Sequence, residues 1–231
     1  MKKGIVYYTH NEGPGYILNA CRDQIDMCLN DMPLVSVSLQ PLDWHENIVL
    51  SLNPCDLTMF KQQLAGLETI DADVVFFCEH DVLYHPSHFD FDPPRDDIYY
   101  FNLNVWAVDA DTGQGIHYDG MRMTSGLVAY RDILIEHYTN KVQWVAERGK
   151  MSRRDIGYEP GKPISRKRLG DYGRRHYRSE YPNVDIKHDF NITRKRFELS
   201  DFNNRKHIEE SWISDYEVPY WGNVKDYLND N

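Results

Sequence analysis

The sequence lacks long hydrophobic runs, paired cysteines and low-complexity tracts. No apolar run approaches the length of a membrane-spanning helix, and the apolar stretch after Met1 is too short for a secretory signal. The four cysteines form no Cys-x-x-Cys pair, which argues against a zinc ribbon or a disulfide scaffold. We therefore expect a cytoplasmic protein with reduced thiols and no membrane span.

The chain does contain enough apolar material to fold. Of its 231 residues, 41% are hydrophobic and 13% are aromatic, which is enough to build one domain with a substantial core. The net charge is −10, but residues 148–178, here called the basic segment, carry eleven basic residues against three acidic ones, a net charge of +8. Such a segment suits a polyanionic partner or the phosphates of a ligand. A solvated loop that balances acidic neighbours would explain it equally well.

The first eighty residues alternate between predicted strands and helices. We expect strands at 4–9, 34–39 and 74–78, and helices at 16–29 and from Asn53 onward. Asn53 can cap the second helix, and Pro54 suits its first turn. This β-α-β-α-β order is typical of a Rossmann-type parallel sheet flanked by helices.

The pattern changes after residue 82. We expect strands at 98–108, 126–130 and 184–188, a helix at 132–148, and loop with short helix in most of the basic segment. This order no longer fits a purely parallel sheet. The sequence therefore predicts the α/β class, with a mixed central sheet and helices on both of its faces.

Residues that can bind a metal ion come after the apolar run 74–78. Glu79, His80 and Asp81 are its immediate neighbours, and His85 lies a few positions further on. Carboxylates and imidazoles suit a divalent ion. If the strand continues, Glu79 and Asp81 point to one side and His80 to the other. An acidic loop that merely solubilises the end of the strand remains the alternative.

The β-α-β-α-β opening, with Glu79-His80-Asp81 at the end of its third strand, resembles the glycosyltransferases of GT-A fold. The resemblance implies that this acidic motif holds Mn²⁺ or Mg²⁺ against the diphosphate of a nucleotide-sugar donor. It also implies that His188, at the end of the last strand, supplies a ligand to the same metal. We expect the metal ligands to be Asp81, His188 and Glu79, although Glu79 can instead bind a ribose hydroxyl.

The same resemblance implies where the donor binds, with a UDP-sugar as the first choice. Polar and cationic side chains at the ends of the predicted strands offer the required donors and acceptors. The residues expected to bind the donor are Thr9, Asn11, Glu12, Asp43, Glu79, His80, Asn191, Thr193, Arg194 and Arg196. The implied domain is single, with a nucleotide-sugar-binding half (1–81), an acceptor half (82–197) that includes the basic segment, and a polar C-terminal tail (198–231).

The catalytic base is sought between the metal motif and the basic segment. Of Asp109, Asp111, His117 and Asp119, we favour Asp119 and then His117, because Gly120 next to them lets backbone approach a substrate. The residues expected to bind the acceptor are Arg166, Lys167, Arg168, Tyr172 and Arg174. Their charge suggests a polyanionic acceptor, such as DNA with a hydroxylated base, as in phage DNA modification. A phage enzyme would then act in the host cytoplasm as a hexosyl- or pentosyltransferase.

Two other classes of protein are compatible with these residues. A metal-dependent hydrolase could use an activated water and the ligand set Glu79, His80, Asp81, His85, His88 and His188. A non-catalytic nucleic-acid-binding module would need only the basic segment and its tyrosines. Neither alternative explains the β-α-β-α-β opening as well as a glycosyltransferase does. The sequence leaves the sugar, the nucleotide base and the oligomeric state open.

Overall fold

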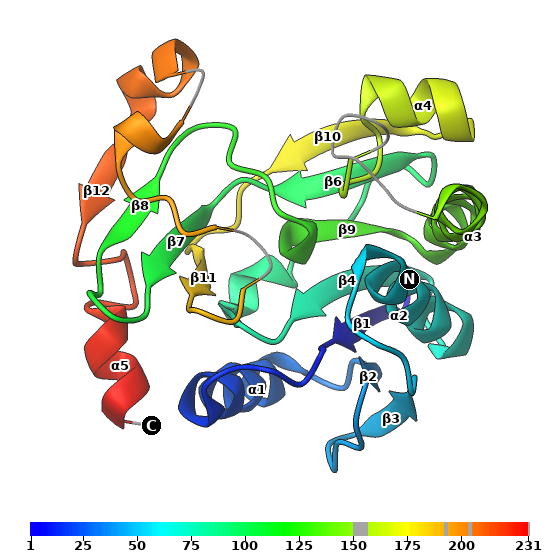
Figure 1. Ribbon diagram of the computed structural model, residues 1–231, viewed down its shortest axis with the longest axis horizontal. Coiled ribbons are helices and arrows are strands. Elements are labelled where there is room, and N and C mark those ends of the chain that lie inside the picture. Colours follow the sequence, from blue (N-terminus) through cyan, green and yellow to red (C-terminus); the bar gives the residue numbers. More distant parts are fainter. Residues whose placement is uncertain (150–156, 192–193, 203–204, 231) are drawn as a thin grey trace.

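The computed structural model describes residues 1–149, 157–191, 194–202 and 205–230 (Figure 1). In these residues, two β-sheets lie side by side and helices pack around them. The first half of the chain builds β1 (Lys3–Tyr8), α1 (Gly15–Cys28), β2 (Leu34–Ser38), β3 (Glu46–Val49), α2 (Asp56–Thr69) and β4 (Val74–Glu79). The predicted β-α-β-α-β opening is confirmed, with β3 as an additional parallel strand beside β2.

The larger sheet has seven strands in the order β10-β6-β9-β4-β1-β2-β3. Three of these come from the second half of the chain: β6 (Ile98–Asn102), β9 (Leu127–Tyr130) and β10 (Gly173–Tyr177). Strand β9 runs antiparallel to both of its neighbours, whereas β1 is parallel to β2 and β4. The sheet is therefore mixed, as the sequence predicted, and β10 lies in a part of the basic segment where we expected loop or short helix.

A second sheet of five strands has the order β12-β8-β7-β11-β5. Its members are β5 (Val82–Leu83), β7 (Val105–Asp109), β8 (Gly115–His117), β11 (Asn183–Lys187) and β12 (Ile213–Asp215). The predicted mixed central sheet corresponds to the larger sheet, and this second sheet was not predicted.

The predicted long strand 98–108 is divided between the two sheets. Strand β6 ends at Asn102 and β7 begins at Val105, because Asn102 and Asn104 turn the chain there. The Asn102 side chain accepts a hydrogen bond from the Asn104 N–H, and the Asn104 amide donates to the Ser179 carbonyl. Side-chain amides that bond to local backbone compete with a continuing strand. Apolar residues continue on both sides of this break, so the sequence pattern predicted a single strand.

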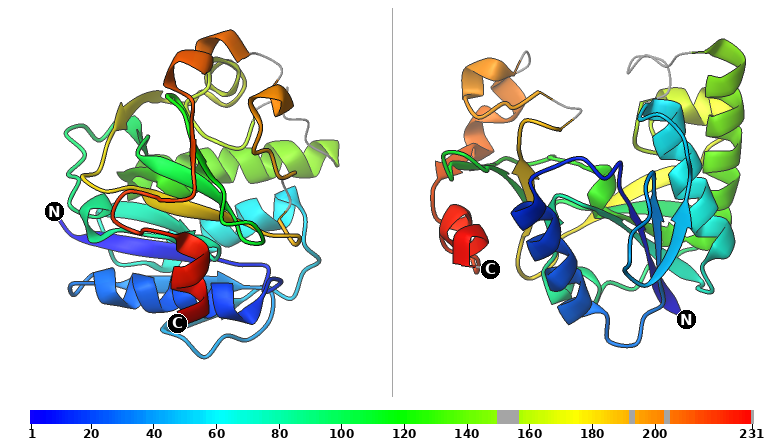
Figure 2. Two further views of the ribbon diagram at one scale, coloured as in Figure 1. Left: turned by 90° about the vertical axis from the view of Figure 1, so that its left-hand side faces the viewer. Right: turned by 60° about the horizontal axis from the view of Figure 1, so that its bottom comes forward.

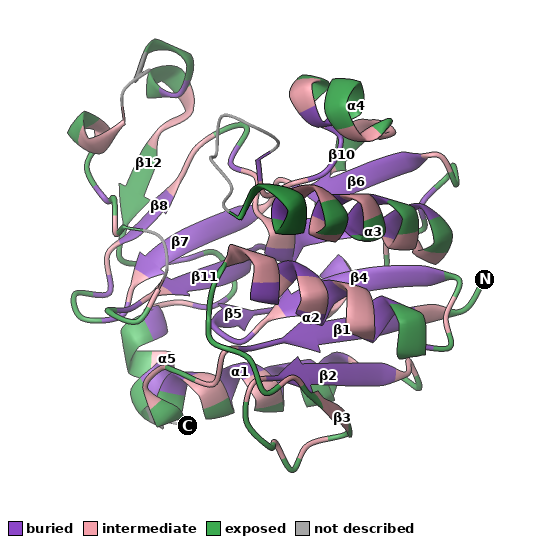
Figure 3. Ribbon diagram, turned by 45° about the vertical axis from the view of Figure 1, so that its right-hand side comes forward, coloured by how far each residue is buried: buried purple, intermediate pink, exposed green. Residues whose placement is uncertain are grey.

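Helices cover both faces of the larger sheet, as predicted (Figures 2 and 3). Helix α1 packs Ile25 and Cys28 against Ile5 and Phe76 on one face. Helices α2 and α3 (Arg131–Arg148) cover the opposite face, where they bury the alternate residues of the same strands. The short helix α4 (Pro163–Leu169) lies beside α3 at the β10 edge of this sheet.

The last residues pack against the smaller sheet instead of forming the polar tail that we expected. Helix α5 (Val224–Asp230) buries Val224 and Leu228 in a core that also contains Ile17 of α1. Short 3-10 helices lie at Pro86–His88, Thr124–Gly126, Leu199–Asp201, Arg205–His207 and Glu209–Ser211. None of the helices within the described residues has both the length and the apolar character needed to cross a membrane.

Candidate metal centre and ligand pocket

Three side chains that can bind a metal meet where β4 and β11 end. His80, Asp81 and His188 each place one potential ligand atom within 4.8 Å of the others, and all three residues are buried. Nε2 of His188 lies 3.8 Å from Oδ2 of Asp81. We call these three residues the metal-capable group; among the described residues, no other cluster of this kind is found.

The pairing of β5 with β11 brings His188 to the end of β4. Val184 pairs with Leu83 in an antiparallel register, and the Ile186 N–H donates to the Asp81 carbonyl at 2.8 Å. Asn191 then joins the two parts. Its side-chain oxygen accepts from the His188 N–H at 2.6 Å, and its amide nitrogen donates to Asp81. The metal-capable group is therefore held by backbone pairing and by one side chain that bridges its members.

The expected division between Glu79, His80 and Asp81 is wrong. Strand β4 ends at Glu79, and His80 and Asp81 form a turn, so the two-residue alternation of a strand does not continue through them. His80 consequently faces Asp81 and His188, whereas Glu79 lies outside the group and accepts a hydrogen bond from the Tyr8 hydroxyl. Burial, together with the charge of Asp81, raises the pKa of Glu79 to about 8.

The polar atoms of the metal-capable group fit a divalent cation. Within the described residues, His80 Nε2, Asp81 Oδ1 and His188 Nε2 are buried without a hydrogen-bond partner. Burial lowers the pKa of His80 to about 4, so its imidazole is neutral and keeps a lone pair. Burial would raise the pKa of Asp81, but His80, Lys187 and His188 outweigh it and hold that pKa below its usual value. Two neutral imidazoles and a carboxylate are a suitable set of metal ligands.

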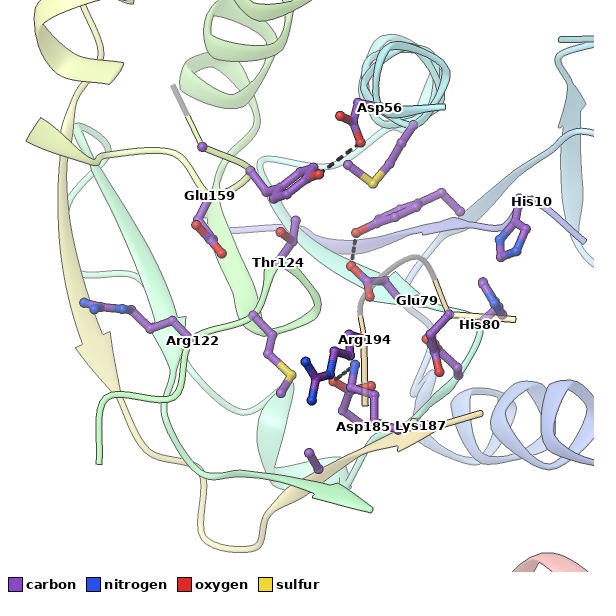
Figure 4. A pocket seen from close by; sticks show the side chains of 18 of the residues that line it. His10, Asp56, Glu79, His80, Arg122, Thr124, Glu159, Asp185, Lys187 and Arg194 are labelled. Atoms are coloured by element: carbon purple, nitrogen blue, oxygen red, sulfur yellow. Dashed lines mark hydrogen bonds and ion pairs between the residues drawn. The ribbon is translucent and has the colours of Figure 1, made fainter. Parts of the chain in front are cut away.

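Two members of the metal-capable group, His80 and Asp81, line a pocket of about 420 Å³ (Figure 4). One wall comes from the end of β1 and the start of α2, and another from the loop between β8 and β9. A third wall comes from residues 157–162, and the smaller sheet together with the segment after β11 forms the rest. The ionisable and cationic side chains along these walls are His10, Asp56, Glu79, Arg122, Glu159, Lys162, Asp185, Lys187, Arg194 and Arg196.

The pocket brings together some of the predicted donor-binding residues but not others. Thr9, Glu79, His80, Asn191, Arg194 and Arg196 line it. Asn11, Glu12 and Asp43 do not, and Thr193 lies outside the described residues. Asn11 has a positive φ of 67°, and its side-chain oxygen accepts from the N–H groups of Leu39 and Gln40. It connects two loops and does not face the pocket.

Neither favoured catalytic base lines the pocket. Asp119 is exposed and ion-paired with Arg178. His117 lies on β8 next to Ile116, which does face the pocket, so strand alternation turns His117 the other way. Its Nδ1 lies 2.7 Å from the Val105 carbonyl oxygen. This geometry gives no support to either residue as the base, nor to the other two candidates, which lie near Lys195.

The predicted acceptor-binding residues also lie away from the pocket. Arg166, Lys167, Arg168, Tyr172 and Arg174 are absent from its lining. Arg168 faces the Trp144 ring at 5.8 Å, and the Tyr172 hydroxyl donates to Glu136. Of the basic segment's cations that the structure describes, Lys162 alone contributes to the pocket. Helix α4, which carries Arg166, Lys167 and Arg168, lies instead at the β10 edge of the larger sheet (Figure 1).

The ligand set of the hydrolase alternative is not assembled. His88 is fully buried, with its ring 5.4 Å from that of Phe76. The His85 ring lies against Tyr181 and Tyr220. Neither histidine joins the metal-capable group, so the described residues offer no second metal site beside it.

Two pocket residues were missed although the sequence contained a signal for them. Asp185 and Lys187 alternate with apolar residues in the strand that leads to His188. Polar residues at every second position mark the face of a strand that is not packed in the core. Lys187 Nζ lies 2.5 Å from Asp185 Oδ2. Arg122 and Glu159, by contrast, lie in loops where no periodicity identifies the face they present.

No protein-family model matches the chain, and no curated protein matches it. Among solved structures, it is similar to a glycosyltransferase involved in the glycosylation of the major capsid of PBCV-1. The identity is 12% and the TM-score 0.47, over 76% of this chain and 82% of that one. It is also similar to the mannosyltransferase PcManGT from Pyrobaculum calidifontis, solved in complex with GDP-Man and Mn²⁺. Here the identity is 11% and the TM-score 0.44, over 80% of this chain and 56% of that one.

The chain has the α/β fold that the sequence predicted. Its β-α-β-α-β opening, its mixed seven-stranded sheet and the acidic motif at the end of β4 all agree with that prediction.

Proposed function

We propose that the protein is a metal-dependent glycosyltransferase that moves a sugar from a nucleoside diphosphate sugar to a hydroxyl group. The observation that carries the proposal is that His80 and Asp81 of the metal-capable group line a pocket that also contains several cations. A diphosphate needs both a divalent ion and cationic hydrogen-bond donors to balance its charge. The pocket lies beyond the carboxyl ends of β1 and β4, where open parallel sheets bind ligands.

The chain's own residues would bind and orient the donor. Arg194 and Arg196 can donate hydrogen bonds to the diphosphate, and Arg194 makes an exposed contact of 3.2 Å with Asp201. Thr9 and the start of α2 form the wall that the nucleoside would contact. His80, Asp81 and His188 would hold the metal. A metal bound there would supply positive charge to the departing diphosphate.

The ligand set also suggests which metals bind best. Mg²⁺ strongly prefers oxygen ligands, whereas Mn²⁺, as a transition-metal ion, accepts imidazole nitrogen beside carboxylate oxygen more readily. Two of the three residues in the metal-capable group are histidines. We therefore propose that Mn²⁺ supports donor binding better than Mg²⁺ does.

We specify the acceptor only as a molecule with a hydroxyl group. The residues of the basic segment that suggested DNA lie outside the pocket, and the floor beside Asp185 is apolar, with Ala107 and Ile116 facing the ligand space. This wall suits the face of a sugar ring better than a phosphate backbone.

A thermal-shift experiment tests the proposal. Wild-type protein is heated with UDP-, GDP- and CDP-sugars, each with and without Mn²⁺. We expect at least one donor to raise the melting temperature by about 5 °C at a hundredfold excess over its Kd, and only when Mn²⁺ is present. The substitution Asp81→Asn should abolish this shift, since it removes a charged ligand.

Asp96→Asn is the control, because Asp96 is exposed and lies outside the pocket. It should keep the full shift. If no donor shifts the wild-type melting temperature with Mn²⁺, or if Asp81→Asn keeps the shift, the proposed function is wrong.

A further inference from the structure

Asp185 is a buried acid in the pocket whose second oxygen has no partner. The residue is 3% exposed and lies on β11, facing the ligand space. Its Oδ2 contacts Lys187 Nζ at 2.5 Å, whereas Oδ1 has no hydrogen-bond partner among the described residues. A buried carboxylate oxygen without a donor is costly, so such an atom calls for a ligand that donates to it.

The residues next to Asp185 are small and apolar. In the smaller sheet, Asp185 pairs with Ala107, and Ala107 pairs with Ile116, so the three side chains form one row across β11, β7 and β8. All three line the pocket, and Met121 borders them from the β8–β9 loop. Ala107 leaves space beside the carboxylate. The row therefore combines an apolar floor with one strong hydrogen-bond acceptor at its end.

This combination fits the chemistry of a sugar. A pyranose or furanose ring has an apolar face, made of its C–H groups, and hydroxyl donors around its edge. A carboxylate can only accept hydrogen bonds, and hydroxyls can donate them. The negative charge of Asp185 disfavours a phosphate oxygen at its free Oδ1, which suits a hydroxyl donor better.

The position along β11 agrees with this chemistry. Asp185 precedes His188 by three residues on one extended segment, which separates their Cα atoms by about 10 Å. Asp185 also pairs with Val82 and so lies beside Asp81, within reach of the sugar of a diphosphate held at the metal-capable group. Lys187 lies between the two residues in sequence, where it fixes the orientation of the Asp185 carboxylate.

We propose that Asp185 accepts hydrogen bonds from hydroxyl groups of the sugar that is transferred, and so selects the donor sugar. This inference rests on the proposed function, since it assigns the sugar end of the same pocket. Lys187 is a positioning residue in this arrangement. Glu79, whose carboxylate binds Tyr8, is not needed for it.

The test distinguishes the contribution of the sugar to binding from that of the nucleotide. Titration calorimetry with Mn²⁺ present measures the affinity of wild type and of Asp185→Asn for UDP and UDP-glucose, and for GDP and GDP-mannose. For the pair that binds, Asp185→Asn should keep the affinity for the nucleoside diphosphate within about twofold. Its affinity for the nucleotide sugar should fall about tenfold or more, because a hydrogen bond to a charged group is lost.

Asp215→Asn is the matched control, since Asp215 lies on β12 of the same sheet but outside the pocket. It should bind both ligands as wild type does. Equal weakening of nucleoside diphosphate and nucleotide sugar by Asp185→Asn would overturn the inference and leave the proposed function standing. No binding of any nucleoside diphosphate to wild type with Mn²⁺ would overturn both.

Deoxy analogues of the donor test the same contact in the wild-type protein, so their result does not depend on the folding of the variant. Removing the sugar hydroxyl that donates to Asp185 should weaken binding to wild type about as much as Asp185→Asn does. The same analogue should bind the variant almost as well as the full donor does, because the analogue and the substitution remove the same contact. Additive losses for every hydroxyl of the sugar would contradict the inference.

Discussion

At the scale of single residues, the difference between Glu79 and Asp81 shows how much depends on where a strand ends. These residues lie two positions apart, so their side chains would point to the same side if β4 continued. The strand stops at Glu79, so its carboxylate is directed to the Tyr8 hydroxyl while Asp81 faces His188. The residue between them, His80, thereby becomes a candidate ligand. A local turn of two residues thus changes the set of candidate ligands.

Close packing at one glycine supports the β1 wall of the pocket. A Cβ added to Gly66 of α2 would lie 2.5 Å from Val6 Cγ1 and 3.2 Å from Val37 Cγ2. Valine is stiff at χ1, so neither contact can relax cheaply. Helix propensity alone would favour alanine at this position by up to about 1 kcal/mol, and the clash should outweigh it.

We therefore predict that Gly66→Ala lowers the free energy of unfolding by about 1–3 kcal/mol in urea titrations. Gly15→Ala is the control, because a Cβ there meets no atom within 4 Å in α1. It should stabilise the protein by about 0.5 kcal/mol. A gain in stability for Gly66→Ala would contradict the packing described here.

At the scale of elements, buried polar side chains attach the basic segment to α3. Lys141 of α3 is fully buried and donates to the Tyr158 carbonyl, next to the pocket residue Glu159. Its Nζ also lies 4.4 Å from the centre of the Phe60 ring. Nδ1 of His137, one turn away, lies 3.2 Å from Asp171 Oδ2. These contacts position the pocket wall at 157–162.

The Lys141 ammonium makes stability depend on pH. Burial lowers its pKa from the ordinary 10.5 to about 7, although Glu159 and Asp171 oppose this. Between these two pKa values, the unfolded chain binds more protons at Lys141 than the folded protein does. This residue therefore makes the free energy of unfolding rise with pH across the window from about 7 to 10.5.

We predict that Lys141→Met removes this rise. Urea titrations at pH 7 and pH 9 measure the free energy of unfolding of both proteins. From pH 7 to pH 9, the value for wild type should rise relative to that for the variant by on the order of 2 kcal/mol. Lys167→Met, at an exposed position on α4, should match wild type at both pH values. Parallel curves for wild type and Lys141→Met would show that Lys141 titrates normally.

At the scale of the whole molecule, the C-terminal residues complete the smaller sheet. Trp221 is buried, and its indole N–H donates to the Pro182 carbonyl at 2.7 Å, immediately before β11. It belongs to the same core as Val184 and Ile186 of that strand. Since β11 carries Asp185 and leads to His188, the end of the chain supports the pocket from behind.

Trp221→Ala should accordingly destabilise the protein by about 3–5 kcal/mol, measured as a shift of the urea midpoint at constant m-value. Tyr216→Ala offers a comparison, because Tyr216 is 55% exposed in the same region. It should change stability by less than about 0.5 kcal/mol. Equal effects of the two substitutions would mean that the C-terminal residues do not support the core.

The sequence by itself determined the β-α-β-α-β opening, the α/β class and the location of the acidic motif, because local periodicity and composition encode them. The run 74–78 has the length and composition of a buried strand, so the acidic motif after it lies at the sheet edge. The resemblance of the sequence to GT-A glycosyltransferases also indicated His188 as a metal ligand.

Only the tertiary structure decided which side chains meet. The pairing of β5 with β11 brings His188 to Asp81 and turns Asp185 into the pocket, and the break at Leu103 creates the smaller sheet that carries them. The same folding leaves Asp119 and the cations of α4 outside. Contacts between strands a hundred residues apart depend on how whole elements pack, and no local pattern records that packing.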